Sequence, residues 1–249
     1  LCGGVLENIQ KPADFIFYNA ITSLNAIRAA SVLRPKKFVN ISSACSYPDT
    51  STDKSLKPEN LWNGRPHETH APYGLAKRFS CEAAQAFSRQ YDLKAINLIL
   101  ANLYGPGDKF DNPAAHAIPS IISRTWDAKE SGYDSVTIYG SPDVTREFLF
   151  VEDAADAIYT LSRQFCDSRP LNVGSGETVT IAEIARRIKI LVGFDGVPMF
   201  AQERLSGQTH RKLDLSGLSA TGWKAQTTLS IGLGKTVKAY METKSLCLR

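Results

Sequence analysis

Short apolar runs alternate with longer amphipathic stretches along this chain. Residues 37–43 and 95–100 read as buried strands, because each is a brief apolar run bounded by polar residues. Helical periodicity is found at residues 14–33, 72–91, 153–165, 180–192 and 229–244. In the first of these helices, one face carries Phe17, Ala20, Ile21, Leu24 and Ile27. Thr180 and Glu183 have the spacing of a capping box. Alternating strands and helices predict an α/β fold with a parallel sheet flanked by helices.

The most specific chemical signal is the pair Tyr73 and Lys77, one helical turn apart. Residues four apart on a helix share a face, so the ammonium is expected to lower the pKa of the phenol. A phenol tuned in this way can exchange a proton with a substrate carbonyl near neutral pH. Ser43, at the end of the first strand, could supply a second hydroxyl to the same oxygen. Because many amphipathic helices carry such a pair, its weight depends on the motifs around it.

Those motifs follow one another in an informative order. They are Asn40-Ile41-Ser42-Ser43, Pro72-Tyr73-Gly74-Leu75-Ala76-Lys77, Asn102-Leu103-Tyr104-Gly105-Pro106, Arg146-Glu147-Phe148 and Asn172-Val173-Gly174. This order resembles the extended short-chain dehydrogenase/reductase family of nucleotide-sugar enzymes, essentially from end to end. The resemblance implies a truncated Rossmann-type parallel sheet flanked by helices, with a smaller α/β substrate-binding lobe. It assigns residues 1–105, rejoined by about 148–175, to the dinucleotide-binding domain, and residues 106–147 and 176–249 to the lobe.

One element of that family pattern is missing. Its members begin with a strand, a Gly-rich turn and a helix whose N-terminus holds the cofactor pyrophosphate. This sequence contains no G-x-G-x-x-G, and residues 1–5 instead resemble the stretch after the family's fourth strand. We therefore expect a fragment that lacks the first two or so βα units, roughly 60–75 residues by the usual length of such units. Alone, such a chain is expected to bind NADP(H) poorly and to be catalytically incomplete.

Two further residues indicate epimerisation. Inverting a carbon beside a ketone needs a base on one face, an acid on the other, and donors that stabilise the enolate. A thiol and an imidazole suit these roles, because both titrate near physiological pH. Alone, a free cysteine is more often a small buried hydrophobe. By resemblance, Cys45 and His116 form the acid–base pair, while Ser43, Tyr73 and Lys77 are the other catalytic residues.

The resemblance also implies binding residues. The cofactor, NADP(H) with NAD(H) left open, would lie against Ser42, Ser43, Tyr73, Lys77, Asn102, Leu103 and His116. The nucleotide-diphosphate sugar would meet Arg124, Tyr139, Arg146 and Arg211, since a guanidinium binds phosphate bidentately. Tyr139 stands where the family usually has tryptophan, and Gly207 where an acidic residue is usual. These two departures leave open which sugar and which nucleotide base the substrate contains.

Composition excludes several other classes of protein. The five cysteines are scattered without a C-x-x-C pair, which argues against a disulfide framework or a metal site and for a reducing, cytoplasmic compartment. The net charge of +4 suits an anionic substrate but not a nucleic-acid-binding face. No apolar run approaches the ~20 residues that span a bilayer. The family resemblance further implies a homodimer built on the helices at 14–33 and 72–91.

Three functions remain open at this point. The first is NADPH-dependent epimerisation and reduction of a GDP-4-keto-6-deoxyhexose. The second is action on another nucleotide sugar, such as a GDP-4-keto heptose, or epimerisation without reduction. The third is a non-catalytic remnant, because the Gly-rich turn is missing. Cys45 together with His116 favours the first two over a plain reductase.

Overall fold

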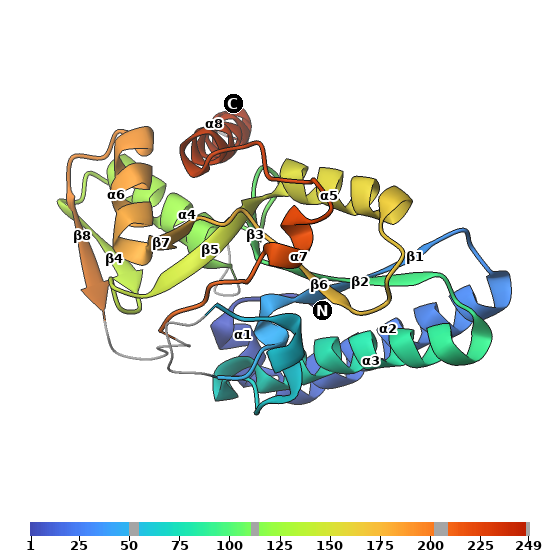
Figure 1. Ribbon diagram of the computed structural model, residues 1–249. Helices are drawn as coiled ribbons and strands as arrows, with labels where there is room; N and C mark the ends of the chain where they lie inside the picture. Colours follow the sequence, from blue (N-terminus) through green and yellow to red (C-terminus); the bar gives the residue numbers. More distant parts are fainter. Residues whose placement is uncertain (50–54, 111–114, 202–208, 248–249) are drawn as a thin grey trace.

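The computed structural model describes residues 1–49, 55–110, 115–201 and 209–247. Its first sheet has the order β1 (Phe38–Ser43), β2 (Ala95–Leu100) and β6 (Pro170–Val173), with all strands parallel. Helices α2 (Pro12–Leu33) and α3 (Ala71–Tyr91) cover one face of this sheet, and α5 (Val151–Gln164) covers the other (Figure 1). This arrangement confirms the predicted α/β fold. Strand β2 is buried along its whole length, as expected for a strand covered on both faces.

The two long helices have clear local causes. Each begins with proline in its first turn, Pro12 in α2 and Pro72 in α3, where the missing N–H is not needed. Each is followed by a residue in the left-handed region, Arg34 with φ of 49° and Asp92 with φ of 54°. Such a residue is a common way to terminate a helix, although glycine is the usual one.

The apolar face predicted for α2 is only partly buried. Ile27 is fully buried against α3, but Phe17 is 61% exposed and Ile21 is 38% exposed. The residues of α2 that are buried are instead Phe15, Asn19, Ile27, Ala30 and Ser31. The predicted apolar face therefore buries Ile27 but leaves Phe17 and Ile21 exposed, so an apolar part of α2 faces outward.

A second group of strands lies beside the first sheet. Strand β3 (Asn102–Tyr104) is parallel to β5 (Thr145–Phe150), which pairs antiparallel with β7 (Thr178–Thr180). A separate parallel pair joins β4 (Ser135–Tyr139) to β8 (Val197–Ala201). Helices α4 (Ala117–Glu130), α6 (Ile181–Val192) and α8 (Leu229–Cys247) pack around them and share one apolar core. The predicted cap of α6 is present, because the Thr180 hydroxyl accepts from the Glu183 N–H at 3.1 Å.

The remaining elements are short. Helix α1 (Val5–Gln10) and the 3₁₀ turns η1 (Ala44–Ser46), η2 (Pro58–Trp62) and η3 (Glu68–His70) border the first sheet, and α7 (Ser216–Ser219) follows β8. The segment that carries α7 packs Leu213, Leu218 and Trp223 into the core of the first sheet. Sequence reasoning had assigned this segment to the substrate-binding lobe. Across the described ranges, every helix is too short or too polar to cross a membrane.

Candidate active site

The carboxyl ends of β1 and β2 open onto a cavity of about 1300 Å³. In open α/β sheets this end of the strands is the usual place for a ligand. The cavity is lined by every site residue that the sequence predicted, from both halves of the chain: Ser42, Ser43, Cys45, Tyr73, Lys77, Asn102, Leu103, His116, Arg124, Tyr139, Arg146 and Arg211. Residues far apart in the sequence therefore meet at one place.

Ser43, Tyr73 and Lys77 form a connected set. The Ser43 hydroxyl lies near enough to the Tyr73 phenol to lower its pKa, and the Ser43 Oγ accepts from the Cys45 N–H at 3.2 Å. The Lys77 ammonium donates to the Ile41 carbonyl at 3.0 Å and lies 5.9 Å from the centre of the Tyr73 ring. Gly74 permits a close approach of α3 to the turn η1 after β1, because a Cβ there would collide with the carbonyl oxygen of Cys45.

The sequence predicted that Lys77 lowers the pKa of Tyr73, but in the structure this pKa is raised. Burial raises the pKa of Tyr73, the nearby sulfurs of Cys2 and Cys45 raise it further, and only the Ser43 hydrogen bond opposes them. Burial also lowers the pKa of Lys77, whose ammonium donates a hydrogen bond to the Ile41 carbonyl. The phenol is therefore held protonated, which is the form that donates a proton.

Ser42 points away from this set. It is 3% exposed, and its hydroxyl lies 3.1 Å from that of Ser46 and donates to the Lys77 carbonyl at 3.3 Å. Its hydroxyl thus joins β1 to α3. Asn102 donates to the Glu147 carbonyl at 2.9 Å, while Leu103 is 36% exposed beside the cavity.

Cys45 has a cationic neighbour that the sequence did not suggest. The Arg211 guanidinium lies 3.4 Å from the Cys45 sulfur and 3.3 Å from Nε2 of His70. Burial lowers the pKa of His70 to about 3, and the charge of Arg211 adds to this shift. His70 is therefore neutral and accepts from Arg211, so its Nδ1 carries the proton toward the Thr69 hydroxyl, 3.2 Å away. No sequence pattern marked His70, because the link with Arg211 exists only in the folded chain.

His116, just before α4, contacts a thiol other than Cys45. Its Nε2 lies 3.5 Å from the sulfur of Cys2. This contact raises the pKa of His116, mainly through the hydrogen bond, and lowers the pKa of Cys2. Sequence reasoning did not identify Cys2, which belongs to no motif. Two thiols therefore line the cavity, one beside Arg211 and one beside His116.

Arginines supply positive charge to the cavity. The Arg124 guanidinium stacks 4.4 Å above the Tyr139 ring, and its Nε donates to Ser120 at 3.2 Å. Arg146 donates to the Thr145 carbonyl at 2.8 Å. Burial lowers the pKa of Arg146 to about 9, with Arg211 adding to the shift, so it remains a cation at neutral pH. These side chains suit an anionic ligand such as a diphosphate. Gly207 lies outside the described residues.

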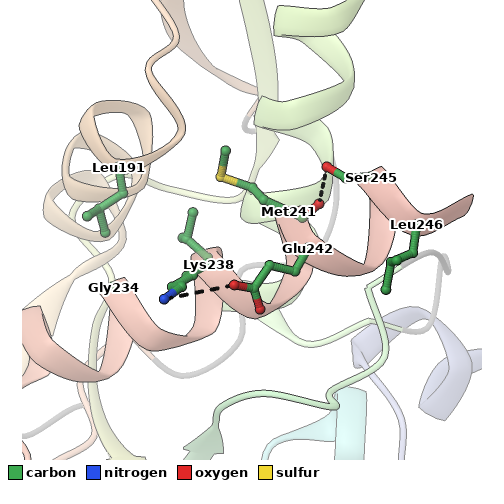
Figure 2. A pocket seen from close by; sticks show the side chains of 8 residues that line it. Leu191, Gly234, Lys238, Met241, Glu242, Ser245 and Leu246 are labelled. Carbon is green, nitrogen blue, oxygen red and sulfur yellow. Dashed lines mark hydrogen bonds and ion pairs between the residues drawn. The ribbon is translucent and has the colours of Figure 1, made fainter. Parts of the chain in front are cut away.

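A second hollow lies between α6 and α8 (Figure 2). Its walls are mostly apolar, with Leu191, Val237, Met241 and Leu246 among them. Lys238 and Glu242 form an ion pair of 3.9 Å across its edge. None of the predicted site residues lines this hollow, so it is not the candidate active site.

Known proteins similar to this chain were found by sequence and by structure. The model of the NAD dependent epimerase/dehydratase family matches residues 2–174. A GDP-L-fucose synthase of Sinorhizobium fredii is 33% identical over 239 residues, covering 96% of this chain and 76% of that protein.

Two solved structures from Campylobacter jejuni are also similar. A GDP-6-OMe-4-keto-L-xylo-heptose reductase superposes with a TM-score of 0.90 at 25% identity, over 98% of this chain and 80% of that one. A GDP-mannoheptose C4 reductase with NADP bound has a TM-score of 0.82 at 28% identity, over 97% of this chain and 79% of that one.

Proposed function

The chain belongs to the NAD-dependent epimerase/dehydratase family, and from this premise we propose NADPH-dependent epimerisation and reduction of a GDP-4-keto-6-deoxyhexose. This is the GDP-L-fucose synthase type within a branch of nucleotide-sugar epimerases and reductases. The observation that carries the proposal is the single cavity in which Cys45 and His116 lie beside Ser43, Tyr73 and Lys77. A plain reductase would need only the last three of these residues.

The epimerisation step uses the two faces of the sugar. Cys45, beside the Arg211 guanidinium at 3.4 Å, removes a proton from a carbon next to the ketone. Ser43 and Tyr73 donate to the ketone oxygen and stabilise the enolate that forms. His116 returns a proton from the other face, so the carbon is inverted. Each step needs a donor and an acceptor placed within hydrogen-bond reach of the reacting atoms.

The reduction step uses the serine, tyrosine and lysine. NADPH, when bound, supplies the hydride that reaches the carbonyl carbon. Tyr73 gives its proton to the carbonyl oxygen, and burial keeps that proton on the phenol until then. Lys77 has three N–H donors and uses one of them in the hydrogen bond to Ile41. The other two can donate to the hydroxyls of the nicotinamide ribose. Asn102, Leu103 and His116 also line the cavity, and we assign them to the cofactor.

The diphosphate would lie against Arg146, Arg211 and Arg124, with Tyr139 beside the nucleotide or sugar. Buried guanidinium groups are strong, orienting ligands of phosphate. We assign the cofactor to residues 1–105 and 148–175 and the nucleotide sugar to the remainder.

The described cysteines Cys2, Cys45, Cys81 and Cys166 are free thiols, which supports a reducing, cytoplasmic setting.

We also propose a homodimer that uses the outer faces of α2 and α3. Phe17 is 61% and Tyr18 50% exposed on α2, and Phe79 is 44% exposed on α3. Large apolar side chains gathered on adjacent helices are typical of an interface.

A GDP-4-keto heptose is the second candidate substrate. The observation that favours it is the TM-score of 0.90 to a heptose reductase. Tyr139, which stands where the family usually has tryptophan, also lines the cavity.

Deuterium exchange separates these functions. Each GDP-4-keto sugar is incubated with the protein in D₂O without NADPH, and NMR follows the protons at C3 and C5. We expect exchange at both carbons, and its suppression in Cys45→Ser, because a hydroxyl is a far weaker acid than a thiol. The matched control is Cys166→Ser, an exposed thiol outside the cavity. Full-rate exchange in Cys45→Ser would remove Cys45 from the mechanism and favour a plain reductase.

A further inference from the structure

Cys2 and His116 form a thiol–imidazole contact within the cavity. The sulfur lies 3.5 Å from Nε2 of His116, although the two residues are far apart in the sequence. Both side chains are exposed to the cavity rather than enclosed in a core. Cys2 is therefore not packed as a small hydrophobe, the common fate of a free cysteine.

The charged groups around this contact favour a negative charge on the Cys2 sulfur and a positive charge on the His116 ring. Lys109 donates to the Cys2 carbonyl at 3.4 Å, and Lys109 and Lys77 both lower the pKa of the Cys2 thiol. Asp108 and the sulfur of Cys45 act on the other partner and raise the pKa of His116. Tyr73 also borders Cys2 but is held protonated. The amino group of Leu1 faces Asn19 at 3.5 Å rather than either partner.

The contact has a chemical consequence for the mechanism. A sulfur that accepts a hydrogen bond from an imidazolium stabilises that imidazolium, because an opposite charge favours the charged form. The second face of the sugar needs a group that arrives with a proton, and an imidazolium has one to give.

We propose that Cys2 is a positioning residue whose sulfur holds His116 in its protonated, proton-donating form beside the sugar. The proposal rests on the proposed function, in which His116 is the acid of epimerisation. Cys45 keeps its role as the base, with the Arg211 guanidinium 3.4 Å from its sulfur. The two thiols thus have different tasks in one cavity.

Titration of the His116 ring tests the proposal without substrate. Ring signals of the protein, labelled with ¹³C at histidine, are followed by NMR from acidic to alkaline pH. His116→Asn identifies the His116 signal among the four histidines. We expect its midpoint to fall in Cys2→Ala and to return in Cys2→Asp, which places an anion at the same point. The matched control is Cys166→Ala, because Cys166 is an exposed thiol 3.5 Å from a lysine ammonium but outside the cavity.

An unchanged midpoint in Cys2→Ala would overturn the proposal. So would a fall that Cys2→Asp does not reverse, since lost packing and not lost charge would then be the cause. The pH profile of deuterium exchange is the second readout: in Cys2→Ala its alkaline limb should move to lower pH. If the His116 midpoint shifts in Cys2→Ala, but neither the wild type nor any variant catalyses deuterium exchange of the sugar, the proposed function fails and the pairing of Cys2 with His116 stands. If exchange proceeds with the same pH profile in Cys2→Ala, the proposal fails and the proposed function stands.

Discussion

At the scale of single residues, Tyr73 shows how burial can outweigh a charged neighbour. The helical spacing places Lys77 on the same face, but its ammonium donates to Ile41 and burial raises the pKa of the phenol. A protonated phenol suits a general acid better than a base.

The first prediction follows for Tyr73→Phe. Loss of the general acid should slow hydride transfer by roughly 10²–10⁴-fold. Deuterium exchange beside the ketone should persist, because Cys45, His116 and Ser43 remain. Oxidation of NADPH, followed by absorbance, measures the first effect and NMR the second. Wild-type reduction by Tyr73→Phe would disprove the assignment of the phenol.

The second prediction concerns acid stability and His70. Its pKa is about 3 in the folded chain, through burial and Arg211, against about 6.5 in an unfolded one. Between these values only the unfolded chain binds the proton, so stability is lost as pH falls through this window. Within this window the free energy of unfolding should fall by up to roughly 1.4 kcal/mol for each pH unit.

Urea unfolding at several pH values between 7 and 4 measures this loss. We expect a shallower decline for His70→Asn, which cannot take up the proton. Equal slopes for wild type and His70→Asn would show that His70 titrates normally.

At the scale of elements, the buried carboxylate of Glu147 joins three segments. It projects from β5, is 1% exposed, and accepts from the N–H groups of Gly176 at 2.8 Å and Leu213 at 3.1 Å. Gly176 precedes β7, and Leu213 follows Arg211 by two residues. This carboxylate therefore fixes the segment that carries Arg211 against the strand that carries Arg146.

The third prediction concerns Glu147→Gln. An amide NH₂ that replaces one acceptor oxygen leaves a buried N–H unpaired, which should cost about 1–3 kcal/mol of the free energy of unfolding. Denaturant unfolding checks the value, with the exposed Glu177→Gln as control. A loss no larger than that of the control would mean that the backbone N–H groups find other partners.

At the scale of the whole molecule, an outward-facing apolar part of α2 remains on the surface of the chain. Phe17 and Tyr18 make an edge-to-face pair, with ring centres 5.3 Å apart. Helices α2 and α3 lie side by side on the face of the sheet opposite α5 (Figure 1). A second copy of the chain could bury both helices.

The fourth prediction tests this association. Phe17→Glu places a charge in the proposed interface and should convert a dimer to a monomer in analytical ultracentrifugation. Tyr159→Glu is the matched control, because Tyr159 is a 64% exposed aromatic residue on α5, on the opposite face of the sheet. A Phe17→Glu protein that sediments like the control would place the interface elsewhere.

The order of motifs in the sequence determined the family and the α/β fold, and it predicted part of the lining of the cavity, although not Cys2 or His70. These features could be predicted because periodicity and local motifs are written in neighbouring residues. The start of α6 at Thr180 is one such local feature. What the sequence alone could not determine is which side chains contact one another across elements.

Only the tertiary structure placed Cys2 against His116, His70 against Arg211, and Leu213 in the core of the first sheet. It also decided that burial, and not Lys77, governs the pKa of Tyr73. The physical reason is the same in each case. Desolvation and contacts between distant segments depend on packing in three dimensions, which no local spacing in the sequence records.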